Sequence, residues 1–386
     1  MKNWSNMLEH ARTQTPPRPA IYASTILLLL FSLLLIGCQG GASATAASPS
    51  ALQLTSASPV GLFTIHMLDR QHGWALNASA VLKTSDGGLH WHAVSPKNSP
   101  ITALAAGDFL NANDAWISIA PDLQHGQKGV RVYSTLDGGK HWRLVTIDDQ
   151  HAVGGGLPEF IDAEHGWLEI GTGVALGSES VDIYRTNDGG QSWTLVSCAG
   201  PQSNCTLGFE GHKSGLLFID RLTGWATGDT ATNRPWLYVT HDGGMSWSRQ
   251  TVPTVPGVSN ASYATLPPVF LGKDGVLPVK VISATINGLD LYTTSDGGKT
   301  WHPGPLSSFS MQNIFILDTQ HAWAVSDSGI YATSNGGQSW SQVNNNVQHI
   351  GTVDFVDPSY GWAIASPDGQ STLLLYTTDG GRTWKP

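Results

Sequence analysis

The stretch Thr84-Ser-Asp-Gly-Gly-Leu-His-Trp91 decides the fold, because six more copies of its Thr-x-Asp-Gly-Gly-x-x-Trp pattern follow it. The copies are Thr135–Trp142, Thr186–Trp193, Thr240–Trp247, Thr294–Trp301, Thr333–Trp340 and Thr377–Trp384. An Asp or Asn at a turn can accept hydrogen bonds from the following backbone N–H groups, and two glycines can take positive-φ positions. Each copy therefore predicts a tight turn held by its acid or amide: Asp86, Asp137, Asp188, Asp242, Asp296, Asn335 and Asp379.

A second repeated element precedes each turn and has a Trp five residues after an Asp or Asn. The pairs are Asp69 and Trp74, Asn111 and Trp116, Asp162 and Trp167, Asp220 and Trp225, Asp318 and Trp323, and Asp357 and Trp362, with Gly272 and Leu277 in the fifth copy. A β-rich run, usually ending in Tyr-x-Thr, separates the two elements. Four strands per repeat predict an all-β fold, a seven-bladed β-propeller of four-stranded antiparallel blades over residues 59–386.

The tryptophans fit this interpretation. Thirteen of the 15 Trp occupy the two repeat positions, and only Trp4 and Trp236 lie elsewhere. Charged residues make up 13% of the chain, too few for solvated amphipathic helices. We therefore expect the repeated Trp rings to pack between blades, where each removes roughly 150–250 Å² from water.

The N-terminus has the pattern of a lipoprotein signal. Basic residues precede an apolar run that ends in Leu35-Ile-Gly-Cys38, a bacterial lipobox. We expect residues 1–37 to be a signal peptide, Cys38 to carry the lipid, and residues 38–58 to be a flexible linker. These features predict a cell-membrane lipoprotein on the extracytoplasmic side. An uncleaved signal anchor is the alternative.

The other two cysteines, Cys198 and Cys205, are seven positions apart and predict a disulfide in such a location. Many His residues occupy repeat turn positions, as His72, His90, His141, His165 and His321 do, so we interpret them as turn residues. The sequence predicts no metal site and no cofactor.

Charge excludes one class of partner. The net charge of −9 becomes −11 once residues 1–37 are removed, because that segment carries three basic residues and one acidic residue. Phosphate binding needs a basic surface, so we expect no nucleic-acid partner.

The turn motif resembles the Asp box, or bacterial neuraminidase repeat, and the resemblance covers residues 60–386. Sialidases, xyloglucan-active glycosidases, sortilin-type receptors and the photosystem II stability/assembly factors share this motif. The assembly-factor family is the most similar in its short blades and its Gly-Trp before the second strand. The resemblance implies that Asp boxes are peripheral structural turns, that none is catalytic, and that the chain acts as a monomeric scaffold for an unknown protein partner.

Strand direction predicts which face of the propeller binds. The Asp boxes and the turns between the first two strands share one face, so the longer connections lie on the other, where binding commonly evolves. Candidate contacts there include Lys128, Asp182 and Lys213. The binding residues that we predict are His125, Arg131, Glu179, Glu210, Arg234, Trp236 and Tyr263.

The sequence argues against sialidase chemistry, which needs three converging arginines, since only Arg131 and Arg234 fall in suitable loops. A glycosidase with two carboxylates stays open, with its pair drawn from Glu159, Glu169, Glu179, Asp182 and Glu210. The interpretation that we favour is a membrane-tethered, non-catalytic protein-interaction or assembly scaffold. The alternative is a propeller that binds or hydrolyses carbohydrate, with a cell-surface glycan as its ligand.

Overall fold

The computed structural model describes residues 61–97, 101, 105–126, 128–202, 204–230, 233–347, 349–366 and 371–386. The predicted signal peptide, Cys38 and the linker lie outside these residues. Within them the structure has 27 strands, one short 3-10 helix, η1 (Leu123–His125), and no α-helix. The described part of the chain contains no helix long and apolar enough to cross a membrane.

The strands follow the seven sequence repeats. The first three repeats contain β1 (Leu62–Met67), β2 (Gly73–Asn77), β3 (Val81–Thr84) and β4 (His92–Ala93); β5 (Ala105–Phe109), β6 (Ala115–Ile119), β7 (Val130–Thr135) and β8 (Arg143–Ile147); and β9 (Gly156–Phe160), β10 (Gly166–Ala175), β11 (Ser178–Thr186) and β12 (Thr194–Ala199). The fourth and fifth contain β13 (Lys213–Phe218), β14 (Gly224–Thr230), β15 (Trp236–Thr240) and β16 (Ser248–Arg249); and β17 (Ser262–Thr265), β18 (Val269–Leu271), β19 (Asp274–Ile282) and β20 (Asn287–Thr294). The sixth and seventh contain β21 (Asn313–Ile316), β22 (Ala322–Ser326), β23 (Gly329–Thr333) and β24 (Ser341–Asn344); and β25 (Ile350–Phe355), β26 (Gly361–Ala365) and β27 (Leu373–Thr377).

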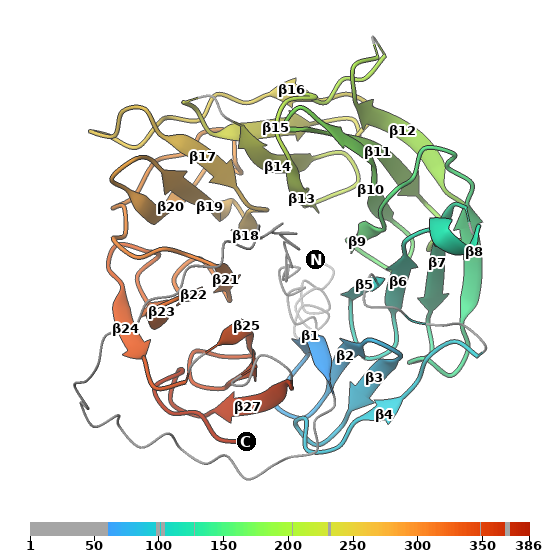
Figure 1. The fold of residues 1–386 in the computed structure, drawn as a ribbon, viewed down its shortest axis with the longest axis horizontal. Helices are drawn as coiled ribbons and strands as arrows, with labels where there is room; N and C mark the ends of the chain where they lie inside the picture. Colours follow the sequence, from blue (N-terminus) through green and yellow to red (C-terminus); the bar gives the residue numbers. More distant parts are fainter. Residues whose placement is uncertain are drawn as a thin grey trace, which may run out of the picture.

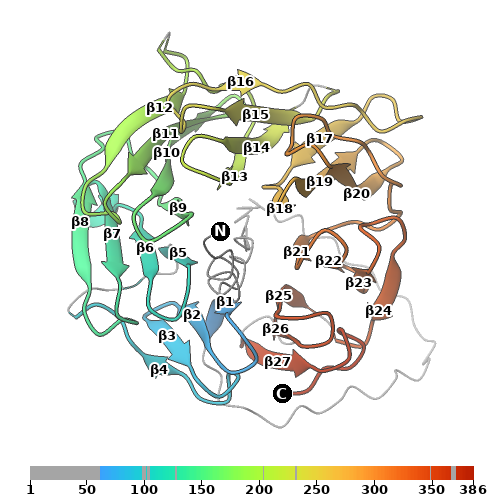
Figure 2. The same cartoon turned by 180° about the vertical axis from the view of Figure 1, so that it is seen from behind.

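The sheets form a ring in which the first strand of most repeats lies innermost (Figures 1 and 2). Neighbouring strands within the repeats are antiparallel, and in every repeat except the fifth they are joined in sequence order, as in β5-β6-β7-β8. The predicted all-β propeller of four-stranded antiparallel sheets is therefore confirmed. The count of seven separate blades stays a prediction, because the strands of the fourth and fifth repeats form one hydrogen-bonded sheet of eight strands.

This merged sheet comes from a segment that the sequence interpretation treats as a loop. The connection 253–265 contains β17, which pairs with the end of β14 at Asp229 and Thr230 and with β19 from Val279 to Ile282. The short strand β18 pairs with the other half of β19. The first strand of the fifth repeat is thus divided into two pieces, one of which reaches back to the fourth repeat.

The hydrophobic core lies between neighbouring repeats. Each buried cluster takes side chains from two successive repeats. In five of these contacts the Trp of the second strand stacks on a Phe of the next repeat: Trp74 on Phe109, Trp116 on Phe160, Trp167 on Phe218, Trp225 on Phe270 and Trp323 on Phe355. The centroid separation is 3.6 Å for Trp167 and Phe218. The predicted packing of these Trp rings between repeats is confirmed.

The Trp that ends the Asp box packs against the same Phe. Trp193, Trp247, Trp301 and Trp384 each meet the Phe of their own repeat edge-on. The second-strand Trp also donates its indole N–H across the joint, as Trp116 does to the Gly189 carbonyl at 2.9 Å and Trp167 does to Gly243. Stacking and hydrogen bonding together fix both the spacing and the height of one repeat against the next.

Acidic side chains at the inner edge of the ring form a second link between repeats. Asp108 accepts the backbone N–H of Phe160, and Glu159 accepts that of Phe218. Burial raises the pKa of Asp108 to about 7. These acids sit three residues before the Asp or Asn of the following turn, and that position is the sequence signal which identifies them.

The ring closes between the seventh and first repeats by side chains. Asp354 accepts the Met67 N–H at 2.6 Å, and Trp362 donates to the Gly87 carbonyl at 2.8 Å. Arg70 forms an ion pair with Asp357 at 2.8 Å. An isolated bridge from Tyr376 to Lys385 gives the last sheet its outer edge.

Candidate functional site

The Asp boxes are the most regular polar feature, and the third one shows how they are built. The Thr186 hydroxyl donates to Asp188 Oδ1 at 2.7 Å and accepts the N–H of Gly190. Asp188 Oδ1 also accepts the N–H of Ser192, while Oδ2 accepts the Ser192 hydroxyl at 2.6 Å. Both glycines of the box have positive φ, at 73° and 84°. The carboxylate therefore holds the turn and the start of the next strand together.

All seven boxes repeat this pattern. In each box the Oδ1 of the acid or amide accepts a hydrogen bond from the backbone N–H four residues further along the chain, rather than from the nearest N–H groups. It runs from His90, His141, Ser192, Ser246, Thr300, Ser339 and Thr383 to the acid or amide of each box. The backbone N–H and the imidazole of this residue lower the pKa of Asp86 and of Asp137 to about 2. The geometry agrees with the structural role that we predict for these residues.

The His residues that we interpret as turn residues make matching contacts. Nδ1 of His72, His165 and His321 lies within hydrogen-bond distance of the Asp three residues earlier. The same Asp accepts backbone N–H groups of its turn, as Asp162 does from Glu164 and His165. These carboxylates are thus engaged in the turns between the first two strands.

A natural Asn at the sixth box defines a test of the third. Asn335 keeps the acceptor role of its Oδ1 and donates through Nδ2 to the Ser339 hydroxyl at 2.9 Å. We expect Asp188→Asn to leave the free energy of unfolding nearly unchanged and Asp188→Ala to lower it by about 1–3 kcal/mol, because Ala leaves the Ser192 N–H without its acceptor. Urea unfolding of the two variants measures the difference. Equal losses for both would show that the side-chain oxygen does not hold the turn.

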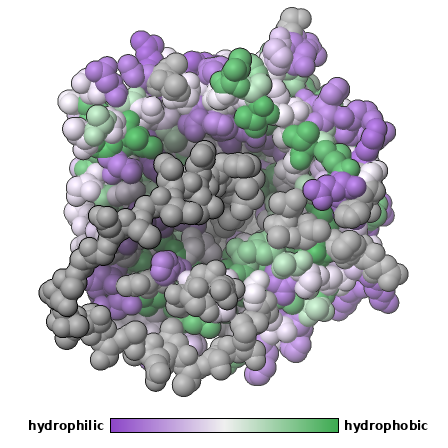
Figure 3. Space-filling model, viewed as in Figure 1, coloured by the Kyte–Doolittle hydropathy of each residue, from purple (hydrophilic) through white to green (hydrophobic). Residues whose placement is uncertain are grey.

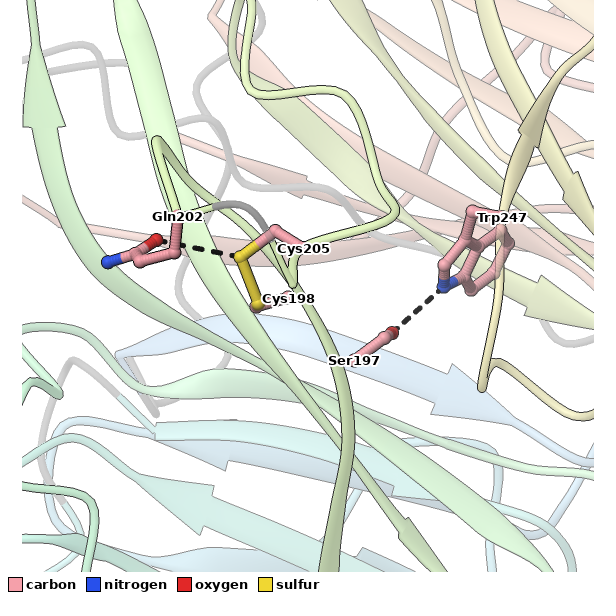
Figure 4. The surroundings of a disulfide bond; sticks show 5 residues. All are labelled: Ser197, Cys198, Gln202, Cys205 and Trp247. Carbon is pink, nitrogen blue, oxygen red and sulfur yellow. Dashed lines mark hydrogen bonds between the residues drawn. A yellow bond between two sulfur atoms is a disulfide. The ribbon is translucent and has the colours of Figure 1, made fainter.

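The face opposite the Asp boxes carries the long β10–β11 hairpin and the connection 199–212. Cys198 and Cys205 form a disulfide that closes part of this connection, as the sequence predicts (Figure 4). Beside it, Ser197 accepts the indole N–H of Trp247 at 3.0 Å and so joins β12 to the next repeat. The hairpin meets the connection through the Glu179 N–H and the Gly211 carbonyl at 2.9 Å.

Lys213 fixes this hairpin to the fourth repeat. Its ammonium lies 3.1–3.2 Å from the carbonyl oxygens of Glu179, Phe209, Glu210 and Gly211, which share its three protons. The same ammonium stands 5.0 Å from the centre of the Trp236 ring. Burial lowers the pKa of Lys213, and nearby carboxylates, Glu169 first among them, oppose that shift. Lys213 therefore has a structural role on this face.

Glu169 is a half-buried acid on β10 whose carboxylate interacts with Lys213. Oε2 of Glu169 is buried and accepts no hydrogen bond from the described residues. Burial, and then the Glu179 carboxylate, raise the pKa of Glu169 to about 8, against the attraction of Lys213. A raised pKa in the folded protein means that the native state holds this proton more tightly than the unfolded chain does.

The stability of the protein should therefore depend on pH through Glu169. Its contribution is fully present below the unfolded pKa of 4.5 and is lost as the pH rises toward about 8. We expect Glu169→Gln, which is neutral at every pH, to match the wild type near pH 4 and to be more stable near pH 8. The exposed Glu164→Gln is the control, and urea unfolding at both pH values is the measurement. A wild-type minus variant difference that does not change with pH would contradict this assignment.

Two residues that we predict as binding contacts lie in the core, so this part of the prediction is wrong. Trp236 begins β15 and is fully buried beneath Lys213. Tyr263 lies on β17 between β14 and β19 and is 1% exposed. An aromatic residue outside the repeat pattern thus fills the core of an irregular repeat instead of facing solvent.

The acids among the predicted contacts have protein partners. Glu179 accepts the Lys213 N–H at 2.8 Å, and Glu210 forms an ion pair with Arg249 at 3.2 Å. Lys128 and Arg234 are exposed in connections between second and third strands, and Arg131 is half-buried on β7. His125 ends η1 in the connection that also carries Lys128.

The tip of the β10–β11 hairpin adds an apolar feature that the sequence interpretation does not identify. Val174 and Leu176 are 64% and 105% exposed. Leu176 adopts a φ of 53°, a conformation that is uncommon outside glycine. On the face shown in Figure 3, polar side chains surround smaller apolar patches. The hairpin tip lies on the same side of the ring as Lys128 and Arg234, because all three belong to connections between second and third strands.

Comparison with known proteins agrees with this architecture. A family model described as photosynthesis system II assembly factor YCF48 matches residues 44–212, and the BNR/Asp-box repeat matches residues 238–249, 292–303 and 375–386. The photosystem II assembly lipoprotein Ycf48 of Synechococcus sp. (strain CC9902) is 24% identical over 344 residues, which cover 79% of this chain and 94% of that protein.

Two solved structures share the fold. YCF48 bound to D1 peptide has a TM-score of 0.52 at 18% identity and covers 87% of this chain and 99% of that chain. YCF48 from Cyanidioschyzon merolae has a TM-score of 0.52 at 16% identity and covers 85% of this chain and 99% of that chain. The chain is therefore a β-propeller of BNR/Asp-box repeats that resembles the photosystem II assembly factors.

Proposed function

We propose that this chain is a non-catalytic β-propeller that binds a protein segment during assembly of a membrane protein complex. The similarity that spans 94% of an assembly lipoprotein carries this proposal. The geometry supports it, because the six Asp-box carboxylates already hold their own turns. A scaffold needs shaped surface and polar anchors rather than a reactive group.

The binding surface in this proposal is the face opposite the Asp boxes, and we call it the hairpin face. It consists of Lys128, Arg131, Val174, Leu176 and Arg234. An apolar hairpin tip on the same side of the ring as long basic side chains suits an extended peptide with an apolar side chain and an acidic group or a carboxyl terminus. Glu179 and Lys213 hold the hairpin in place beneath this surface, and in this proposal they do not contact the partner.

The wild-type chain should bind a D1-derived peptide, with affinity that falls as salt concentration rises. We expect Arg234→Ala and Leu176→Ala each to weaken binding roughly five- to thirtyfold, since anchors at the centre of an interface cost about 1–2 kcal/mol or more when truncated. Arg143→Ala and Leu195→Ala, at exposed positions on the outer strands β8 and β12, are the matched controls. Fluorescence anisotropy with a labelled peptide measures these affinities.

Two outcomes would overturn the proposal. One is equal binding by the hairpin-face variants and the controls. The other is turnover of a fluorogenic sialoside or of xyloglucan oligosaccharides that a single Glu or Asp substitution abolishes, which would make the chain a glycoside hydrolase.

The location in this proposal is the extracytoplasmic face of the cell membrane, with a lipid on Cys38. The lipobox Leu35-Ile-Gly-Cys38 supports it, as does the similarity to the Synechococcus assembly lipoprotein. The polar linker 38–58 would then leave the ring free to meet a membrane-embedded partner.

Substitution of the lipobox cysteine tests this location. We expect Cys38→Ala to abolish the mass of the diacylglycerol adduct and to block cleavage of the signal segment, because both depend on the Cys thiol. Cys205→Ser, which removes only the disulfide, should keep the lipid. Intact-protein mass spectrometry of membrane fractions is the measurement. A wild-type chain found at its full uncleaved mass would identify the segment as a signal anchor instead.

A further inference from the structure

A cluster of potential metal ligands lies between the second and third repeats, on the same side of the ring as the hairpin face. Asp149 and His151 lie in the connection from β8 to β9, and Asp182 lies on β11. One ligand atom from each of the three side chains lies within 4.8 Å of the other two. Asp182 lies 31 or more positions after Asp149 and His151 in the chain, so the fold and not a local motif brings it to them.

The charges of this cluster are not balanced by a basic side chain. The Asp149 side chain is 2% exposed, and His151 Nδ1 lies 3.9 Å from its Oδ1. Asp182 is half-buried and faces Asp149, and the described residues place no Lys or Arg in an ion pair with either carboxylate. Burial, and then the Asp149 charge, raise the pKa of Asp182 to about 6. Buried charges in proteins are normally paired or bound to a metal.

The donors are already oriented. The Tyr184 hydroxyl donates to Asp149 Oδ2 at 3.1 Å, which leaves lone pairs of this carboxylate directed elsewhere. The backbone N–H of His151 donates to Asp149 Oδ1 at 2.8 Å, and the backbone N–H of Val153 donates to the Gly171 carbonyl at 2.9 Å. The second bond holds the β8–β9 connection against the third repeat. The His151 imidazole is 82% exposed and can turn toward an ion without disturbing the core.

We propose that Asp149, His151 and Asp182 bind one divalent transition-metal cation, Zn²⁺ or Mn²⁺, which joins the second repeat to the third. One imidazole nitrogen with two carboxylates suits these ions, whereas Ca²⁺ and Mg²⁺ prefer sites made of oxygen alone. Water would complete the coordination on the exposed side of His151. The cation would neutralise the two carboxylates and fix β11 against the β8–β9 connection. This proposal does not depend on the proposed function.

Metal titration of the full chain, purified in detergent and treated with a chelator, tests the site. Zn²⁺ and Mn²⁺ should each bind with one saturable equivalent that raises the unfolding temperature by about a few degrees at saturation, and Ca²⁺ should not. Co²⁺ bound there should show visible absorption of a nitrogen- and oxygen-ligated ion. His151→Ala and Asp182→Asn should weaken this equivalent about tenfold or more.

Matched variants separate this site from ordinary surface binding. Asp148→Asn removes an adjacent acid, and His72→Ala removes a similar Asp–His pair formed with Asp69 at another turn. Both should leave the equivalent intact. Without metal, Asp182→Asn should be at least as stable as the wild type, because it relieves repulsion from Asp149.

The proposal fails if His151→Ala and Asp182→Asn bind metal like the wild type. It also fails if neither Zn²⁺ nor Mn²⁺ raises the unfolding temperature of the wild type, which would mean that a proton, and not an ion, is shared by the two carboxylates.

Discussion

The stacking of a Trp from one repeat on a Phe from the next is the contact on which the ring depends. A single four-stranded sheet of this length has two faces and cannot bury both alone, so each repeat needs its neighbours. In the joint between the third and fourth repeats, Trp167 lies parallel to Phe218, and Trp247 meets the same Phe edge-on. The indole N–H of Trp167 then reaches the Gly243 carbonyl of the adjacent Asp box. Trp167 thus contributes both a packing contact and a hydrogen bond to this joint.

This joint explains why the Asp box is so regular. The carbonyl that receives the indole belongs to the first glycine of the box, and a side chain there would have little space: a Cβ on Gly243 would stand 2.7 Å from the Arg221 carbonyl. Thr, Asp and the residue four positions later hold this glycine in place by hydrogen bonds. The turn supports the neighbouring repeat, and its carboxylate is engaged in the hydrogen bonds that hold the turn.

Much of this architecture could be predicted from the sequence, because the same residue types recur at the same positions of each repeat. Seven copies of one turn gave the strands, the buried Trp rings and the role of residues such as Asp188. What the sequence could not supply was the local departure from the pattern. Trp236 and Tyr263 stand outside the repeat and so looked like surface contacts. Both are buried: Trp236 packs between the third and fourth repeats, and Tyr263 packs between the fourth and fifth. The inner acids Asp108 and Glu159 occupy the same position of their repeats, three residues before the Asp or Asn of the turn. Their role as acceptors becomes clear only once the strand that donates to them is placed beside them. The ligand cluster around Asp149 depends on distances between repeats, which no motif records.

The β14–β17 pairing has a consequence for how the ring comes apart. Elsewhere in the described strands, successive repeats meet mainly through side chains and isolated backbone contacts, but here two repeats share a ladder of main-chain bonds. Cooperative units in repeat proteins follow the strength of their internal joints. The fourth and fifth repeats should accordingly open and close as a double unit, while the other repeats can separate one at a time.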